Sequence, residues 1–247
     1  MRGFAKLILM GIKLYFREFV ALFFTIVFAP LMLVLFGSIY GNKPTPFFGG
    51  YGTVDIMVPA YIGLIIVTVG LISIPISTAS ARESKVLKRF RAAPLHPFVY
   101  MASELVSYLI VTVLGVLLLV LAGRLIYGAR FEGNILSVSA AFLLGSLSIF
   151  SLGYLIAALA PTARIAQTVG MAVAFPIMFL SGATIPWELL PQTIRNFSRF
   201  LPLTHVVSLM RGLWFGEPWG KHLTEVAVLV GVMAIGGALA SLLFRWE

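Results

Sequence analysis

Residues 56–81 read IMVPAYIGLIIVTVGLISIPISTASA, a stretch without one charged side chain. An α-helix needs about 20 apolar residues to cross the roughly 30 Å of hydrocarbon in a bilayer, so this stretch alone is long enough to span a membrane. The composition agrees, because 60% of the 247 residues are hydrophobic and 11% are charged, whereas soluble domains average about 25% charged residues. The mean hydropathy is +1.02. The sequence therefore predicts an integral membrane protein and excludes a soluble globule.

Five further uncharged, apolar runs flank this stretch, and each is long enough to span a bilayer. None has the strict alternation of barrel strands, so we expect an all-α membrane protein with six transmembrane helices, forming one domain over residues 1–247. Cutting the chain at charged residues also places every carboxylate beyond the ends of the runs, Asp55 and Glu104 included, and predicts a largely nonpolar interior. The six runs are residues 19–42, 56–81, 105–123, 133–163, 165–187 and 226–244.

Charge predicts the orientation in the membrane. The net charge is +9, from 18 Lys and Arg against 9 Asp and Glu, and basic residues cluster before the first run and just after the second. The positive-inside rule therefore places both termini and residues 82–97 in the cytoplasm of a multi-pass protein of the cell membrane. This need accounts for the basic excess without a nucleic-acid partner. The chain has no cysteine, which excludes disulfides and thiol chemistry.

Residues 1–18 predict an interfacial amphipathic helix. At 100° per residue, Arg2, Lys6, Lys13 and Arg17 share a sector of about 60°, with apolar side chains elsewhere. Such a helix lies on the inner leaflet and leads directly into the first span. The alternative is a ragged cytoplasmic extension of that span. The interrupted apolar pattern is not that of a cleavable signal peptide.

Residues 82–97, RESKVLKRFRAAPLHP, predict a short cytoplasmic helix. Val86, Leu87 and Phe90 fall on one side of it, basic residues project from the other, and Pro94 ends the helix. The apolar ridge could dock into a soluble partner. Alternatively, the helix rests on anionic membrane lipid.

Residues 186–220 contain four prolines, at positions 186, 191, 202 and 218. Their uncharged core, residues 200–210, covers about 16 Å as a helix and is too short to cross. We expect short re-entrant helices that dip into the outer leaflet, with Trp187, Trp214 and Trp219 at the interface. The alternative is an ordinary interfacial loop.

Catalytic and cofactor motifs are missing from the sequence. There is no G-x-S-x-G elbow, no HExxH and no P-loop, and the three histidines match no metal spacing. The chain is therefore expected to be no enzyme and to bind neither ATP, metal nor another cofactor. An ion-driven carrier is disfavoured because no ionisable group falls inside a run. A membrane enzyme acting on lipids and a membrane scaffold remain as rivals.

Span five carries Phe175, Met178 and Phe179 within a sector of about 100° to 120°. These side chains either pack against a neighbouring helix or line a permissive cavity for an amphipathic molecule. Small residues allow close helix approach, including approach by a second copy of the chain. The pairs spaced for such contacts are Gly37 with Gly41 and Gly170 with Ala174.

The order of these elements resembles the type 2 membrane permeases of ATP-binding-cassette exporters. Residues 82–98 and 175–216 carry the resemblance. In the second stretch the family pattern "SG...P.E.LP", "PLT" and "RG" is met by Ser181, Gly182, Pro186, Glu188, Leu190, Pro191, Pro202, Leu203, Thr204, Arg211 and Gly212. The chain departs from the family at Lys85 and Val86, where Gly-Thr is frequent, and at His205, where Tyr is common. These departures concern subfamily and substrate.

The resemblance implies a half-transporter that pairs with a second copy, while a separate ATPase subunit binds ATP and Mg. Its substrate would be an amphipathic or hydrophobic drug, antibiotic or lipid-linked compound, as in multidrug exporters, or alternatively a polysaccharide or glycolipid. Residues 82–97 would be the coupling helix, with ATPase contacts at Glu83, Val86, Leu87, Lys88, Phe90, Arg91 and Pro94. The outer gate candidates are Ser181, Gly182, Glu188, Thr204, His205 and Arg211.

Overall fold

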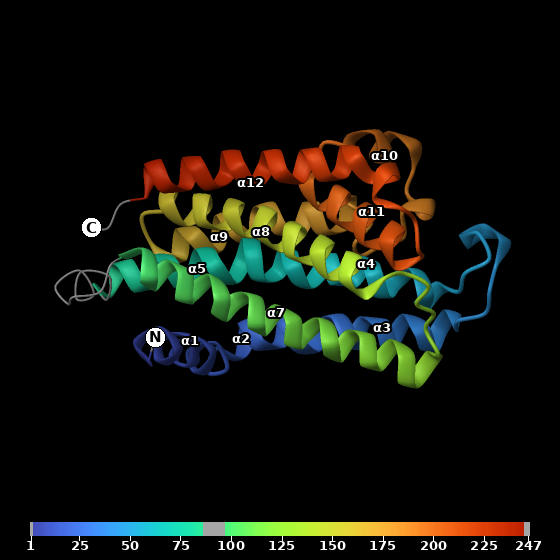
Figure 1. The fold of residues 1–247 in the computed structure, drawn as a ribbon, viewed down its shortest axis with the longest axis horizontal. Helices are drawn as coiled ribbons and strands as arrows, with labels where there is room; N and C mark the ends of the chain where they lie inside the picture. The colour runs from blue at the N-terminus through green and yellow to red at the C-terminus, as the bar shows by residue number, and fades with distance from the viewer. Residues whose placement is uncertain (1, 86–96, 245–247) are drawn as a thin grey trace.

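The computed structural model describes residues 2–85 and 97–244, and these ranges contain helices but no strand (Figure 1). The first half comprises α1 (Arg2–Tyr15), α2 (Phe19–Leu22), η1 (Phe23–Val27), α3 (Phe28–Tyr40), η2 (Pro46–Phe48), α4 (Thr53–Val67), η3 (Thr68–Ser73) and α5 (Ile74–Glu83). The second half comprises α7 (Pro97–Tyr127), α8 (Ile135–Leu159), α9 (Ala163–Leu180), η4 (Trp187–Leu189), α10 (Gln192–Ser198), α11 (Pro202–Trp214), η5 (Trp219–His222) and α12 (Leu223–Leu243).

Six helical stretches within the described ranges are long and apolar enough to cross a membrane. Their number and order confirm the prediction of an all-α protein with six spans. They are Phe23–Tyr40, Pro46–Glu83, Val99–Tyr127, Ile135–Leu159, Ala163–Leu180 and Trp219–Leu243.

The second span lies at the centre of the bundle. Its α4 part contacts α3, α7, α8 and α11, and its η3 and α5 parts contact α8 and α9. The side chains of its apolar window are all buried. A helix that is apolar on every side is stable only when other helices surround it, and this explains why the stretch around residues 56–81 forms the core.

Glycine and serine allow the later helices to approach closely. A Cβ on Gly153 of α8 would lie 1.9 Å from the carbonyl oxygen of Gly70 in η3, so only glycine permits this contact. Between α8 and α12, the hydroxyl of Ser151 donates to the Val232 carbonyl at 3.3 Å, and the hydroxyl of Ser148 donates to the Leu229 carbonyl. Small residues and interhelical hydrogen bonds of this kind hold membrane helices together.

Both ends of the described chain lie at the same end of the bundle as the end of α5 and the start of α7 (Figure 1). There α1 runs along α7. A Cβ on Gly11 would lie 2.7 Å from the Ser107 hydroxyl, and Tyr15 bonds to Thr25 at 2.5 Å. We call this the inner end and the opposite one the outer end.

Two carboxylates that the sequence placed beyond the spans are in fact inside the protein. Asp55 is fully buried in the first turn of α4, and Glu104 lies two turns inside α7. The prediction of a nonpolar interior was wrong at these positions. Cutting the chain at every charge assumes that charges end helices, whereas a buried carboxylate can remain where hydrogen bonds or nearby groups accommodate it.

Candidate functional site

Between α9 and α12 the outer end is built from four short helices, and a proline stands at the start of each. Pro186 and Pro191 precede η4 and α10, Pro202 is the first residue of α11, and Pro218 precedes η5. The fixed φ of proline and its missing N–H suit it to such positions. The prolines therefore divide the chain into the short helices that the sequence predicted.

The third of these helices lies deeper than expected. One face of α11 is buried against α4, α8 and α12, and Trp214 is only 5% exposed. Its indole N–H donates to the Arg130 carbonyl at 2.8 Å. The prediction that Trp214 lies at the membrane interface was wrong, because this side chain locks α11 onto the connection between α7 and α8.

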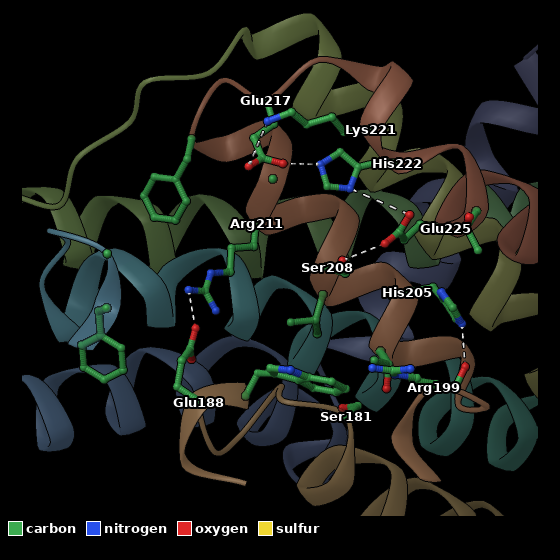
Figure 2. Close-up of a pocket in the computed structure, with 18 of the residues that line it drawn as sticks. Ser181, Glu188, Arg199, His205, Ser208, Arg211, Glu217, Lys221, His222 and Glu225 are labelled. Carbon is green, nitrogen blue, oxygen red and sulfur yellow. Dashed lines mark hydrogen bonds and ion pairs between the residues drawn. The ribbon is translucent and has the colours of Figure 1, made fainter. Parts of the chain in front are cut away.

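A cavity of about 1050 Å³ opens at this end, between the short helices, the start of α12 and the connection between α3 and α4. Five of the six outer gate candidates line it: Ser181, Glu188, Thr204, His205 and Arg211 (Figure 2). The sixth, Gly182, adopts a φ of +84° next to Trp187. A positive φ of this kind favours glycine, so this residue shapes the turn beside the cavity.

An ion pair joins two of these candidates across the cavity wall. Arg211 of α11 lies 2.6 Å from Glu188 of η4, and each side chain is about a quarter exposed, at 26% and 24%. Arg195 of α10 donates to the Leu190 carbonyl at 2.7 Å and to the Glu188 carbonyl at 3.2 Å. The two arginines thus fix η4 against α10 and α11. On the opposite side, the His205 ring nitrogen lies 2.9 Å from the Arg199 carbonyl oxygen.

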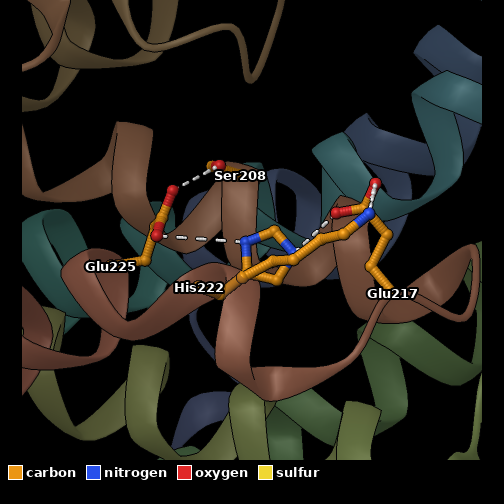
Figure 3. A network of polar contacts seen from close by, with 5 residues as sticks. Ser208, Glu217, His222 and Glu225 are labelled. Atoms are coloured by element: carbon orange, nitrogen blue, oxygen red, sulfur yellow. Dashed lines mark hydrogen bonds and ion pairs between the residues drawn. The ribbon is translucent and has the colours of Figure 1, made fainter.

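A second polar network, which the sequence analysis missed, joins residues of the cavity lining (Figure 3). The Ser208 hydroxyl donates to Glu225 at 3.0 Å. The buried His222 ring lies between Glu225, 3.9 Å from Nδ1, and Glu217, 3.0 Å from Nε2. The only signal in the sequence is the group of charged residues that precedes the last span.

Close packing holds this histidine in place. A Cβ on Gly212 of α11 would lie 2.0 Å from His222 Nε2, so the glycine of the family's "RG" pair leaves room for the ring. The match to that pattern therefore has a physical reason in the structure.

Aromatic side chains form another part of the cavity wall. The rings of Tyr51 and Phe215 stack at 3.9 Å between centroids, with 29° between their planes. The other aromatic residues of the lining are Phe47, Phe48 and Trp187. The cavity therefore combines charged groups with flat apolar faces. Among the described residues, no three His, Asp or Glu side chains form a group that could hold a metal ion.

Asp55, in the first turn of α4, stabilises the outer end through hydrogen bonds. Its carboxylate accepts hydrogen bonds from the Arg130 N–H at 2.9 Å, the Gly52 N–H at 3.0 Å and the Asn42 side-chain amide at 3.0 Å. These donors belong to the connection between α3 and α4 and to the one between α7 and α8. A single carboxylate thus ties two outer connections to the central helix.

The structure does not bring the three substrate-path candidates together. Met178 is 4% exposed and belongs to the core, whereas Phe175 and Phe179 are 41% and 49% exposed on the outside of the bundle. The face of α9 that packs inward is set by Gly170, where a Cβ would lie 2.3 Å from the Leu71 carbonyl oxygen, and by the fully buried Ala174.

The small-residue pairs expected to contact a second copy lie elsewhere. Gly170 and Ala174 pack inside the subunit, as does Gly37, where a Cβ would lie 2.6 Å from the Tyr127 ring. Gly41, with a φ of +67°, ends α3. The close approaches at Gly37 and Gly170 are therefore made within one bundle, and Gly41 makes none.

Of the predicted ATPase contacts, only Glu83 is described, and it is the last residue of α5 at the inner end. The remaining ones, Val86, Leu87, Lys88, Phe90, Arg91 and Pro94, lie outside the described residues.

Comparison with known proteins gives a match to the family described as "ABC-2 family transporter protein" over residues 43–244. The inner membrane transport permease YhhJ of Escherichia coli (strain K12) is 33% identical over 177 residues, which cover 66% of this chain and 44% of that protein. Nodulation protein J of Rhizobium leguminosarum bv. trifolii is 37% identical over 92 residues, which cover 37% of this chain and 34% of that protein.

The matched part thus spans less than half the length of each relative. The family match, in contrast, covers all six apolar stretches except the first and includes both the cavity and residues 82–97. Together with the six-span fold, it shows that this multi-pass membrane protein belongs to the ABC-2 family of transporter permeases.

Proposed function

We propose that the chain is the membrane half of an exporter, which moves an amphipathic or hydrophobic compound outward from the cytoplasm or the inner leaflet. A separate ATPase subunit binds and hydrolyses ATP. The protein lies in the cell membrane, and its inner end faces the cytoplasm. The observation that carries this proposal is the convergence of five gate candidates on one cavity at the end opposite the end of α5 and the start of α7. An exporter needs two such separate ends, because the ATPase drives the conformational change from one side of the membrane and the substrate leaves on the other.

Two copies would form the path. The outward face of α9 carries Val173, Phe175 and Phe179, all more than a third exposed in the single bundle. In a symmetric dimer such a face could pack against its own copy and line a route along the two-fold axis. Introducing Val173→Cys into this cysteine-free chain should then give an oxidised dimer, whereas Leu117→Cys on the equally open face of α7 should not. Crosslinking of both or of neither would contradict this arrangement.

The coupling segment is tested by placing charge on its apolar ridge. Leu87→Asp with Phe90→Asp should prevent docking to the ATPase, because a charged group would have to be desolvated at the contact. Ser84→Asp adds charge to the same segment outside the ridge and serves as the control. ATPase co-purification should be lost in the first variant and retained in the second. Equal co-purification of both would assign the ridge to lipid.

A glycan or glycolipid is the second candidate cargo. The charged and aromatic lining of the outer cavity, with the stacked pair Tyr51 and Phe215, is of the kind that binds sugars. The two cargoes are separated by measuring stimulation of ATP hydrolysis in the reconstituted complex with hydrophobic cations, lipids and glycans. Response to apolar compounds, unchanged in Phe215→Ala, supports the first proposal. Response to glycans alone, lost in Phe215→Ala, supports the second.

A further inference from the structure

A second cavity lies at the inner end, between the amphipathic helix α1 and the helices α5 and α7. Its volume is about 350 Å³, within the range of roughly 300–1,000 Å³ of small-molecule sites. Met10 and Leu14 of α1 line it and are 57% and 50% exposed, so the cavity opens beside α1. The other lining residues include Leu7, Tyr15, Glu18, Tyr100, Glu104 and Tyr108.

Glu104 is the unusual member of this lining. One carboxylate oxygen, Oε1, accepts a long hydrogen bond of 3.5 Å from the Thr78 hydroxyl. The other, Oε2, is buried and has no hydrogen-bond partner. Within residues 2–85 and 97–244, no Lys, Arg or His forms a salt bridge with it. A buried carboxylate in this condition is costly unless a proton or a cation neutralises it.

The residue types in the rest of the lining indicate which class of cation would fit this cavity. Apolar side chains from α1 cover one side, and phenol rings cover another, with Tyr15 and Tyr108 edge to face at 5.9 Å. The lining also carries the hydroxyls of Ser73, Ser77, Ser103 and Ser107, of which Ser103 and Ser107 already donate to carbonyls of their own helix and Ser73 bonds to Tyr15. A small inorganic cation needs oxygen ligands on all sides at about 2.0–2.6 Å, and a cavity of about 350 Å³ is far larger than such an ion. Aromatic faces beside a carboxylate suit an organic cation, whose charge is diffuse and whose body is apolar. With Glu18 as a second acid on the lining, an anionic ligand is disfavoured.

We propose that this cavity binds a lipophilic organic cation, with its charged group at Glu104 and its apolar body between α1 and α7. The inference deepens the proposed function, on which it rests for the direction of transport: the site would receive cationic amphiphiles from the inner leaflet. Binding itself requires neither the ATPase nor the outer cavity.

The experiment measures equilibrium binding of radiolabelled tetraphenylphosphonium to the permease in lipid nanodiscs, with empty nanodiscs subtracted. Glu104→Gln keeps the size of the side chain and its contact with Thr78 but removes the charge. It should weaken binding about tenfold or more, as expected for loss of a desolvated charge partner. Glu132→Gln removes a carboxylate at the outer end, where Glu132 accepts a bond from Tyr51, and should bind as the unaltered chain does.

Tetraphenylborate, which has the same shape and the opposite charge, is measured in separate samples because the two ions form an insoluble pair, and it should not bind above the empty nanodiscs. Equal phosphonium affinity of Glu104→Gln and the unaltered chain, or binding of the borate as tight as that of the phosphonium, would overturn the proposal, and the cavity would then be an apolar cleft. Failure of the proposed function has a different result: the reconstituted complex with its ATPase would move no compound, while phosphonium binding and its loss in Glu104→Gln would be unaffected.

Discussion

Asp55 and Glu104 are both shielded carboxylates on membrane helices, but their surroundings are opposite. Asp55 accepts three hydrogen bonds from N–H groups of two connections, whereas Glu104 has one long contact and an oxygen without a partner. A fully paired carboxylate in a protein interior holds the fold together. An incompletely paired carboxylate beside a cavity can still form a favourable interaction with a bound ligand. Asp55 therefore stabilises the outer end, whereas we propose that Glu104 at the inner end interacts with a ligand.

The strongest test of this comparison removes the acid of the outer end. Asp55→Ala leaves the N–H groups of Arg130 and Gly52 and the amide of Asn42 without an acceptor. We expect a loss of about 3–5 kcal/mol in stability, the usual cost of breaking a buried charged network. The measurement is the midpoint of thermal unfolding in detergent, followed by size-exclusion chromatography. Glu132→Gln, on a neighbouring exposed side chain, should shift the midpoint little. A stable Asp55→Ala protein would show that the connections are held by other contacts.

The inner half depends on close packing of backbones. Gly153→Ala places a methyl group 1.9 Å from the Gly70 carbonyl oxygen, so α8 must move away from η3. Overpacking of this kind costs about 1–3 kcal/mol. Gly237→Ala on α12 is the matched control, because nothing lies within 4 Å of its Cβ and alanine favours a helix over glycine. Unfolding midpoints should fall for the first variant and stay or rise for the second. If the unfolding midpoints of both variants fall by the same amount, separation of α8 from η3 is not the cause of the destabilisation.

The six spans could be predicted because a continuous apolar run has only one stable arrangement in a bilayer. Their ends could not be predicted by the same reasoning. The run beginning at residue 105 is the middle of a helix that starts at Pro97, because the carboxylate of Glu104 is enclosed by tertiary contacts. The sequence gives no local sign of that enclosure.

The sequence also singled out residues that lie together at the outer end, while their role as a gate stays a prediction. A pattern of short motifs identified Ser181, Glu188, Thr204, His205 and Arg211, and the fold brings them to one cavity. Their neighbours Glu217 and Glu225 were missed because they meet His222 only after η5 turns the chain. In span five, Phe175 and Phe179 are both exposed on the outside of the bundle, and their role in a substrate path stays a prediction. The angular sector could not show that Met178 faces the core, since that depends on where Gly170 meets η3.

The gate ion pair offers a smaller effect. Arg211→Gln with Glu188→Gln, compared with each single variant, measures the coupling of two partly exposed charges. We expect a coupling of about 0.5–1 kcal/mol in the free energy of unfolding, because solvent screens such pairs. Substrate-stimulated ATP hydrolysis should change more than stability does, if the pair closes the outer cavity. A coupling near zero would mean that the Arg195 contacts alone position η4.

The smallest expected effect on stability is at Glu104, and it separates the two acids most sharply. Asp55→Asn and Glu104→Gln are the same chemical change, a carboxylate replaced by an amide of equal size. In Asp55→Asn the new NH₂ group meets N–H donors and must destabilise the fold. In Glu104→Gln the Thr78 hydroxyl can still donate to the amide oxygen, and a poorly compensated buried charge is removed. We expect the free energy of unfolding of Glu104→Gln to stay within about 0.5 kcal/mol of that of the unaltered chain or to rise. A decrease in the free energy of unfolding as large as that in Asp55→Asn would mean that Glu104, too, stabilises the fold. It would then argue against Glu104 as a partner for a bound cation.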